Sequence, residues 1–146
     1  MTYPQHELTK TIIECIIKVH KTLGPGFLES IYRNALKIEL QKRNLNVEME
    51  REFLIYYDSQ EVGCHRLDIL VENRIILELK TVNGLDAAHY AQVRSYLKAT
   101  NRKLALLVNF SRERADFRRI ELYKSPPPPH LHIPFSYTRD FRKFLV

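Results

Sequence analysis

The chain has 146 residues, of which 45% are hydrophobic and 27% are charged, so it is long enough for one globular domain with a buried core. Its two cysteines, Cys15 and Cys64, exclude a disulfide framework and a cysteine-based metal site, and we expect a reducing, cytoplasmic location. The longest aliphatic run, residues 104–108, is too short to cross a bilayer, and the first ten residues lack the apolar core of a secretory signal. We therefore expect no membrane association.

The net charge of +6 is unevenly distributed along the chain. Basic and acidic residues cancel over residues 1–101, whereas residues 102–146 contain ten basic and four acidic residues. A local basic surface attracts phosphate backbones, although it can equally be a solvated surface that aids solubility. Four arginines here are candidates for contacts with nucleic acid, with a solvated loop as the alternative interpretation: Arg112, Arg114, Arg118 and Arg119.

Apolar spacing predicts two helices and then a strand in the first part of the chain. Apolar residues at positions 8, 12, 16, 19 and 23 form one helical face, and Gly24-Pro25-Gly26 ends that helix. A second helical pattern follows, with apolar residues at positions 28, 31, 35 and 38. Residues 47–57 first alternate charged and apolar side chains and then become aromatic, which is typical of one strand, and residues 58–60 supply a turn.

The rest of the chain predicts a hairpin at residues 65–80, a helix at 85–101, a buried strand at 103–110 and a possible last strand at 118–124. The predicted order is therefore α, α, β, β, β, α, β, then a possible β. Four consecutive prolines at 126–129 favour a stiff polyproline II spacer. We divide the chain into a domain at 1–124 and a Pro-rich spacer with a C-terminal arm at 125–146, where a homo-oligomer could form.

The hairpin "HRLDILVENRIILELK" combines apolar faces with ionisable groups. Side chains alternate across a strand, so each arm has one wholly apolar face, at positions 67, 69 and 71 and at positions 75, 77 and 79. A two-residue turn would set Val71 against the wrong face. We therefore predict a three-residue connection or a bulge, with a positive φ at Asn73. Either device brings Asp68 to the same face as Glu78 and Lys80.

Two carboxylates on one face repel each other unless a cation lies between them. Mg²⁺ takes oxygen ligands and keeps several waters, one of which can attack a phosphodiester. Lys80 points to the same side as Glu78 and could orient that water or stabilise the developing negative charge. The alternative is that Asp68, Glu78 and Lys80 form an ordinary surface ion pair of small energetic value.

Two helical motifs accompany the hairpin. The stretch "GFLESIY" has the form Gly-x-x-Glu-x-x-Tyr, in which Glu29 and Tyr32 are neighbours on one helical face after Gly26. The stretch "QVRSY" is Gln-x-x-x-Tyr, which likewise places Gln92 and Tyr96 on one helical face. Each motif is weak by itself and compatible with a purely structural role.

Together with Asp68 and "ELK", these motifs resemble the PD-(D/E)XK nuclease superfamily, and within it the family named for its GxxExxY motif. The resemblance covers roughly residues 7–123. It implies an α/β (α+β) fold with a restriction-endonuclease-like αβββαβ core, in which helices flank a central mixed sheet. It also implies a nuclease that uses Mg²⁺ or Mn²⁺ and favours DNA over RNA. The alternative is a nucleic-acid-binding or adaptor module that keeps the fold without catalysis.

By position, the resemblance implies that Asp68, Glu78 and the Leu79 backbone carbonyl are metal ligands and that Lys80 is the catalytic lysine. Glu29 would complete the acidic site as a further ligand. Gln92 and Tyr96 match the motif of the RecB-like and λ-exonuclease-like branch, in which such residues line the site and contact substrate. Gly26 and Tyr32 would be the structural members of their motif. The proline that gives the superfamily its name is replaced, because Leu67 precedes Asp68.

Overall fold

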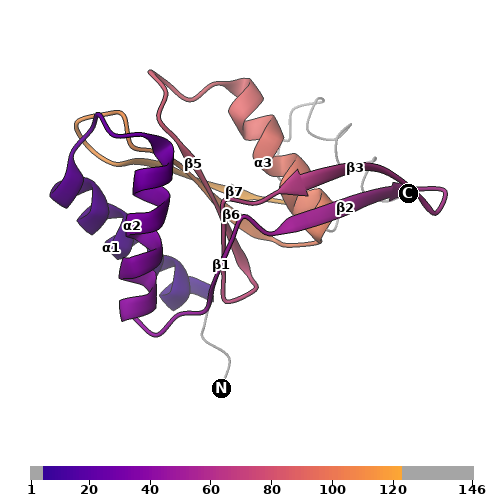
Figure 1. The fold of residues 1–146 in the computed structure, drawn as a ribbon, viewed down its shortest axis with the longest axis horizontal. Helices are drawn as coiled ribbons and strands as arrows, with labels where there is room; N and C mark the ends of the chain where they lie inside the picture. Colours follow the sequence, from indigo (N-terminus) through magenta and orange to yellow (C-terminus); the bar gives the residue numbers. More distant parts are fainter. Residues whose placement is uncertain (1–4, 123–146) are drawn as a thin grey trace, which may run out of the picture.

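Helices cover both faces of a mixed five-stranded sheet in the computed structural model, which describes residues 5–122 (Figure 1). The described elements are α1 (Gln5–Leu23), α2 (Glu29–Lys42), β1 (Val47–Met49), β2 (Glu52–Tyr57), β3 (Gln60–Arg66), β4 (Ile69–Val71), β5 (Ile75–Lys80), α3 (Ala87–Thr100), β6 (Leu104–Asn109) and β7 (Asp116–Glu121). The sheet order is β1-β4-β5-β6-β7, with β5 parallel to β6 and the other neighbours antiparallel. Strands β2 and β3 form a separate two-stranded ribbon.

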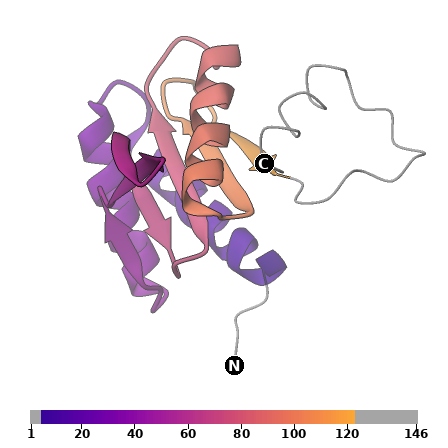
Figure 2. The same cartoon turned by 90° about the vertical axis from the view of Figure 1, so that its right-hand side faces the viewer.

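The predicted fold class is confirmed. The αβββαβ order is supplied by α2, β1, β4, β5, α3 and β6, and the β2–β3 ribbon is inserted between β1 and β4. Strands β5 and β6 are covered on both faces, which explains why their sequences are nearly continuous apolar runs. One face packs Ile69, Leu77 and Leu79 against α1 and α2, and the other packs Leu70 and Ile76 against α3 (Figures 1 and 2).

The loop between α1 and α2 explains two residues of the Gly-x-x-Glu-x-x-Tyr motif. Gly26 has φ +111°, a backbone conformation that is strongly unfavourable for residues other than glycine. The buried Tyr32 hydroxyl donates a hydrogen bond to the Gly24 carbonyl at 2.5 Å and accepts one from the Phe27 N–H at 3.2 Å. The Tyr32 ring stacks on Phe110, with centroids 4.5 Å apart. These contacts set where α2 begins, and therefore where Glu29 lies.

The prediction of one strand over residues 47–57 is wrong. Glu50 has φ +53°, so the chain turns out of the main sheet after β1 and continues as β2 in the ribbon. The ribbon returns at the same place, because the Leu67 N–H donates to the Arg51 carbonyl at 2.9 Å and the Glu50 N–H donates to the Asp68 carbonyl at 3.0 Å. The first arm of the predicted hairpin is consequently divided: residues 65 and 66 belong to β3, and only residues 69–71 form β4. Leu67 packs with the α3 side, away from Ile69.

The connection between β4 and β5 is the predicted three-residue one. Val71 pairs with Ile75, which leaves residues 72–74 unpaired, and Asn73 has φ +54°. Glu72 is left-handed too, with φ +52°. The register therefore brings Asp68 to the level of Glu78 along the sheet, as the alternation of apolar residues required.

Some predictions lie beyond the part of the chain that the structure describes. The boundary at residue 124, the polyproline spacer at 126–129 and the C-terminal arm as an oligomer interface all fall outside residues 5–122. The last strand, β7, runs from Asp116 to Glu121, two residues earlier than predicted at its start. Within residues 5–122 no helix combines the length and the apolar character needed to span a membrane.

Candidate active site

The candidate site lies at the end of the sheet where β5 finishes and β4 begins, on the face covered by α3. Alternation along β5 turns Leu77 and Leu79 toward α1 and α2, whereas Ile76 packs on the α3 side. Glu78 and Lys80 share the parity of Ile76 and so face α3. In the "ELK" segment, Leu79 therefore faces the buried core on one side of the strand, and Glu78 and Lys80 face a polar site on the other side.

Asp68 lies in the bend between the ribbon and β4, next to the edge of β5. Its Oδ2 accepts a hydrogen bond from the Leu79 N–H at 2.8 Å. On the other edge of β5, the Lys80 carbonyl accepts from the Phe110 N–H at 2.9 Å. The N–H and C=O of one strand residue point to the same edge, so the Leu79 carbonyl is directed toward the Asp68 side. Asp68, Glu78 and this carbonyl are oxygen donors at one end of the sheet.

Glu78 is buried, with 4% of its surface exposed, and its Oε2 atom has no hydrogen-bond partner among the described residues. Burial is the largest cause that raises the pKa of Glu78, Asp68 and Glu29 add to the rise, and Lys80 opposes it, so that together they place this pKa at about 9. A buried carboxylate oxygen without a partner costs free energy, and a cation would remove that cost. The donor set therefore fits a hard divalent ion, which binds through one or two carboxylates and retains water.

Lys80 is held by α3. Its Nζ donates a hydrogen bond to Gln92 Oε1 at 2.8 Å, so the helical face that carries the Gln-x-x-x-Tyr motif is turned toward Lys80. Tyr96 lies one turn further along the same face of α3 and is 7% exposed. Burial, followed by the charge of Glu78, raises the pKa of the Tyr96 phenol. Tyr96 therefore remains a protonated hydrogen-bond donor at neutral pH.

Glu29 is the first residue of α2 and lies at the margin of the acidic pair. Burial raises the pKa of Glu29, Asp68 raises it further, and Lys80 and Arg33 lower it, so Glu29 is within electrostatic reach of the site. Within residues 5–122, however, no three His, Cys, Asp or Glu side chains are arranged to hold a metal ion together. The structure thus brings together Asp68 and Glu78 as the carboxylate pair and leaves Glu29 beside them.

Two residues of the site were not identified from the sequence. Arg33 lies one helical turn after Glu29, and its guanidinium pairs with Asp68 Oδ1 at 3.4 Å and with Glu50 at 3.3 Å. The His65 and Tyr96 rings are in edge-to-face contact, with their centroids 4.8 Å apart. Arg33 could have been identified from its position one helical turn after the glutamate of the motif. The contact between His65 and α3 depends on the ribbon, which the sequence pattern did not predict.

The segment after Lys80 is fixed by a buried asparagine. Asn109, at the end of β6, accepts a hydrogen bond from the Val82 N–H at 3.1 Å and donates one to the Val82 carbonyl at 2.8 Å. His20 forms a 2.6 Å hydrogen bond with the Arg112 carbonyl, and the Arg112 side chain lies beside Gly84. These contacts secure the backbone that carries Lys80 into α3.

The four arginines expected to contact nucleic acid do not share one surface. Arg118 and Arg119 are successive residues of β7 and point to opposite faces of the sheet. Arg118 pairs with Asp116 at 3.1 Å, and Arg119 pairs with Glu121 at 2.8 Å. Arg118 lines a hollow with Arg112 and Arg114, whereas Arg119 lines a different one. The four arginines therefore divide between two separate surfaces, and their contact with nucleic acid stays a prediction.

Comparisons with known proteins agree with the fold. The family model of the PD-(D/E)XK nuclease superfamily matches residues 6–120. The crystal structure of SSO0001 is similar to this chain, with a TM-score of 0.53 and 26% sequence identity over 64% of this chain and 50% of that one. The similarity thus spans half the length of SSO0001. No curated protein matches the chain.

Proposed function

This chain belongs to the PD-(D/E)XK nuclease superfamily, and on that premise we propose that it hydrolyses phosphodiester bonds of nucleic acid with a divalent metal ion, Mg²⁺ or Mn²⁺. The observation that carries the proposal is the buried Glu78 carboxylate. Its Oε2 has no partner among the described residues, and it faces Asp68 and Lys80. A purely structural role would not require a buried carboxylate with an oxygen that lacks a hydrogen-bond partner.

Asp68, Glu78 and the Leu79 carbonyl would hold the ion, and Glu29 would interact through a bound water. Bound there, the ion would neutralise phosphate charge and provide an activated water. In the structure the Arg33 guanidinium balances the charge of Asp68. When the ion binds, this guanidinium would keep only its second partner, Glu50, with which it already forms an ion pair. The acidic pair would otherwise remain partly protonated, because the raised pKa of Glu78 opposes its ionisation.

Lys80 has the role of orienting the attacking water and stabilising negative charge on the phosphoryl oxygens. Its partner Gln92 is neutral, so the hydrogen bond fixes the ammonium group without neutralising it. Tyr96 stays protonated and offers a hydroxyl donor to substrate. Arg112, beside the segment that follows Lys80, is the one arginine of the predicted set that we assign to substrate phosphates.

We extend the proposal to the GxxExxY family and to the RecB-like and λ-exonuclease-like branch. The support is the contact of Gln92 with Lys80 and the roles of Gly26 and Tyr32 in setting the start of α2. For that reason we favour DNA over RNA. We also propose a catalytic domain at 1–124, a C-terminal arm at 125–146 that could join copies of the chain, and a cytoplasmic location in keeping with two free cysteines.

A second candidate is a nucleic-acid-binding or adaptor module without turnover. The ion pair between Arg33 and Asp68 favours it, because a guanidinium already occupies one of the two carboxylates. Metal binding separates the two functions. A catalytic site should bind Mn²⁺ with an affinity that falls at least tenfold in Asp68→Asn, whereas a module without turnover should show no such dependence.

The decisive experiment is hydrolysis of single- and double-stranded DNA and RNA with Mg²⁺ or Mn²⁺. We expect Glu78→Gln and Lys80→Ala each to lower the rate by at least a hundredfold, while exposed counterparts, Glu7→Gln and Lys42→Ala, leave it unchanged. Full activity in both site variants, or no hydrolysis of any substrate by the unmodified protein, would contradict the proposal.

A further inference from the structure

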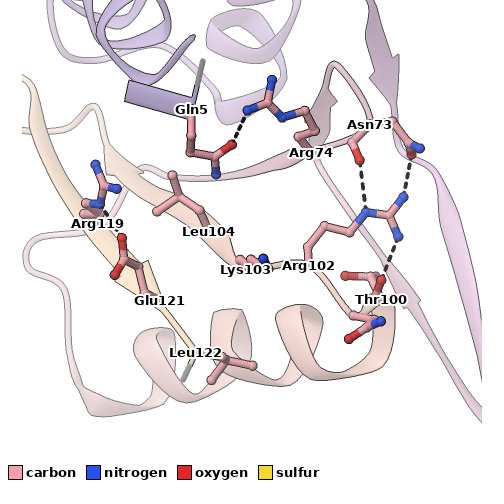
Figure 3. Close-up of a pocket in the computed structure, with 11 residues that line it drawn as sticks. Gln5, Asn73, Arg74, Thr100, Arg102, Lys103, Leu104, Arg119, Glu121 and Leu122 are labelled. Carbon is pink, nitrogen blue, oxygen red and sulfur yellow. Dashed lines mark hydrogen bonds and ion pairs between the residues drawn. The ribbon is translucent and has the colours of Figure 1, made fainter. Parts of the chain in front are cut away.

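A second polar surface lies at the end of the sheet opposite Lys80. It is a hollow of about 760 Å³ between the β4–β5 connection, the α3–β6 connection, the end of β7 and the first residue of α1 (Figure 3). Ile75 pairs with Leu104 at one end of the parallel pair and Lys80 pairs with Asn109 at the other. The length of β5 therefore separates the hollow from the candidate active site by roughly 20 Å, at about 3.3 Å per residue.

Basic side chains dominate the lining of this hollow. Among the described residues the lining holds four cations and one carboxylate: Arg74, Arg102, Lys103, Arg119 and the acidic Glu121. Glu121 forms an ion pair with Arg119 at 2.8 Å, and the described lining as a whole carries an excess of positive charge. Figure 3 shows Arg102 and Lys103 on the α3–β6 connection and Arg119 on β7, around the hollow. The arrangement creates a concentrated positive potential on a concave surface.

Arg102 is held in place by neutral acceptors. Its guanidinium donates to the Asn73 carbonyl at 3.2 Å, to the Asn73 side chain and to the Thr100 carbonyl at 2.7 Å. Arg51 donates to the same Asn73 side-chain oxygen at 3.2 Å, and both guanidiniums lie over the Phe53 ring. Burial, together with the charge of Arg51, lowers the pKa of Arg102. Arg51 also forms an ion pair with Glu48 at 2.9 Å, whereas the printed hydrogen-bond acceptors of Arg102 are all neutral, so the charge of Arg102 is available to an anion.

We propose that this hollow binds phosphate groups, of a nucleic-acid strand or of a free nucleotide, at a site separate from Asp68 and Glu78. Guanidinium and ammonium groups are the usual protein partners of phosphate oxygens, and the volume suits a ligand larger than a single phosphate. The site is preorganised, because the Asn73 contacts already fix Arg102.

Lys103 is the residue to change, because it is exposed and Arg102 has an architectural role at Asn73. Lys103→Glu reverses one charge of the hollow, and Lys42→Glu makes the same change in net charge on an exposed residue of α2 that does not line it. Arg119→Gln is a second variant, which removes a cation from another wall of the hollow. Circular dichroism melts establish that all three remain folded.

Binding is measured in EDTA, so that the result does not depend on hydrolysis. Pyrophosphate and ATP are titrated by calorimetry, and a fluorescein-labelled 16-nucleotide single strand by anisotropy at several salt concentrations. We expect Lys103→Glu to weaken binding about tenfold and to reduce the salt slope by about one, with a change below about twofold in Lys42→Glu. Arg119→Gln should weaken binding in the same direction.

The ligands distinguish the two sources of phosphate. If pyrophosphate and ATP bind and displace the strand, the hollow binds free or terminal phosphates; if the strand alone binds and Lys103→Glu weakens it, the hollow holds backbone phosphates. Equal effects of Lys103→Glu and Lys42→Glu, or no binding of any probe, would overturn the proposal. Loss of hydrolysis in Glu78→Gln with this binding retained would show that the two sites are independent.

Discussion

Glu78→Gln should stabilise the metal-free protein at neutral and alkaline pH. The folded-state pKa of Glu78 is raised from 4.5 to about 9 by burial and by Asp68, so the folded protein retains a proton that the unfolded chain has lost. Stability from this group is therefore full below pH 4.5 and declines as the pH rises toward 9. At about 1.4 kcal/mol per pH unit, the loss at pH 7 is about 3 kcal/mol, and glutamine, which does not ionise, avoids it.

Urea denaturation in EDTA at pH 5 and pH 8 measures this difference. The advantage of Glu78→Gln over the unmodified protein should grow by at most about 4 kcal/mol between the two pH values, whereas Glu7→Gln should show no such growth. Added Mg²⁺ should reverse the order at pH 8 by binding only the carboxylate form. A glutamine variant that is less stable than the unmodified protein at pH 8, with no change in the difference from pH 5, would refute the reasoning.

Three further outcomes follow from the contacts around the site. Tyr32→Phe removes the hydroxyl that bonds Gly24 and Phe27, and urea denaturation should show a loss of about 1–2 kcal/mol; unchanged stability would mean that these bonds do not hold the loop. Gln92→Ala should lower the rate of hydrolysis about tenfold, less than Lys80→Ala, because it frees the ammonium without removing it; equal losses would assign Gln92 a direct role. Asn109→Ala leaves both backbone groups of Val82 unpaired and should cost about 2–3 kcal/mol in a thermal melt, with a near-zero shift counting against the anchoring role.

Alternation along the strands carried most of the correct reasoning about the site. The requirement that the apolar faces coincide predicted the three-residue connection at residues 72–74 and the positive φ of Asn73. The same rule could have separated Arg118 from Arg119, since successive strand residues face opposite ways. Helical spacing likewise predicted that Gln92 and Tyr96 face the same way. These features depend on local geometry, which a sequence records directly.

Other features depend on how distant segments meet. Residues 50–52 are all charged, which breaks the alternation of residues 47–57, but this break alone does not signal the left-handed residue at which the strand leaves the sheet. The ion pair of Arg33 with Asp68 and the ring contact of His65 with Tyr96 join elements that are distant in the chain. The resemblance implies that Glu29 is a metal ligand; the fold places it at the margin of the acidic pair, and that role stays a prediction.

The β2–β3 ribbon leaves and rejoins the sheet at a single crossing point, where Glu50 bonds the Asp68 carbonyl and Leu67 bonds Arg51. Asp68 is therefore aligned with Glu78 by the main sheet, and the length of the ribbon does not enter that alignment. Its outer end, at Asp58 and Ser59, is an exposed tight turn. Such a turn can accept inserted sequence without shifting the carboxylates. The ribbon is thus a replaceable module, through which new contacts can evolve or be engineered while the candidate active site stays constant.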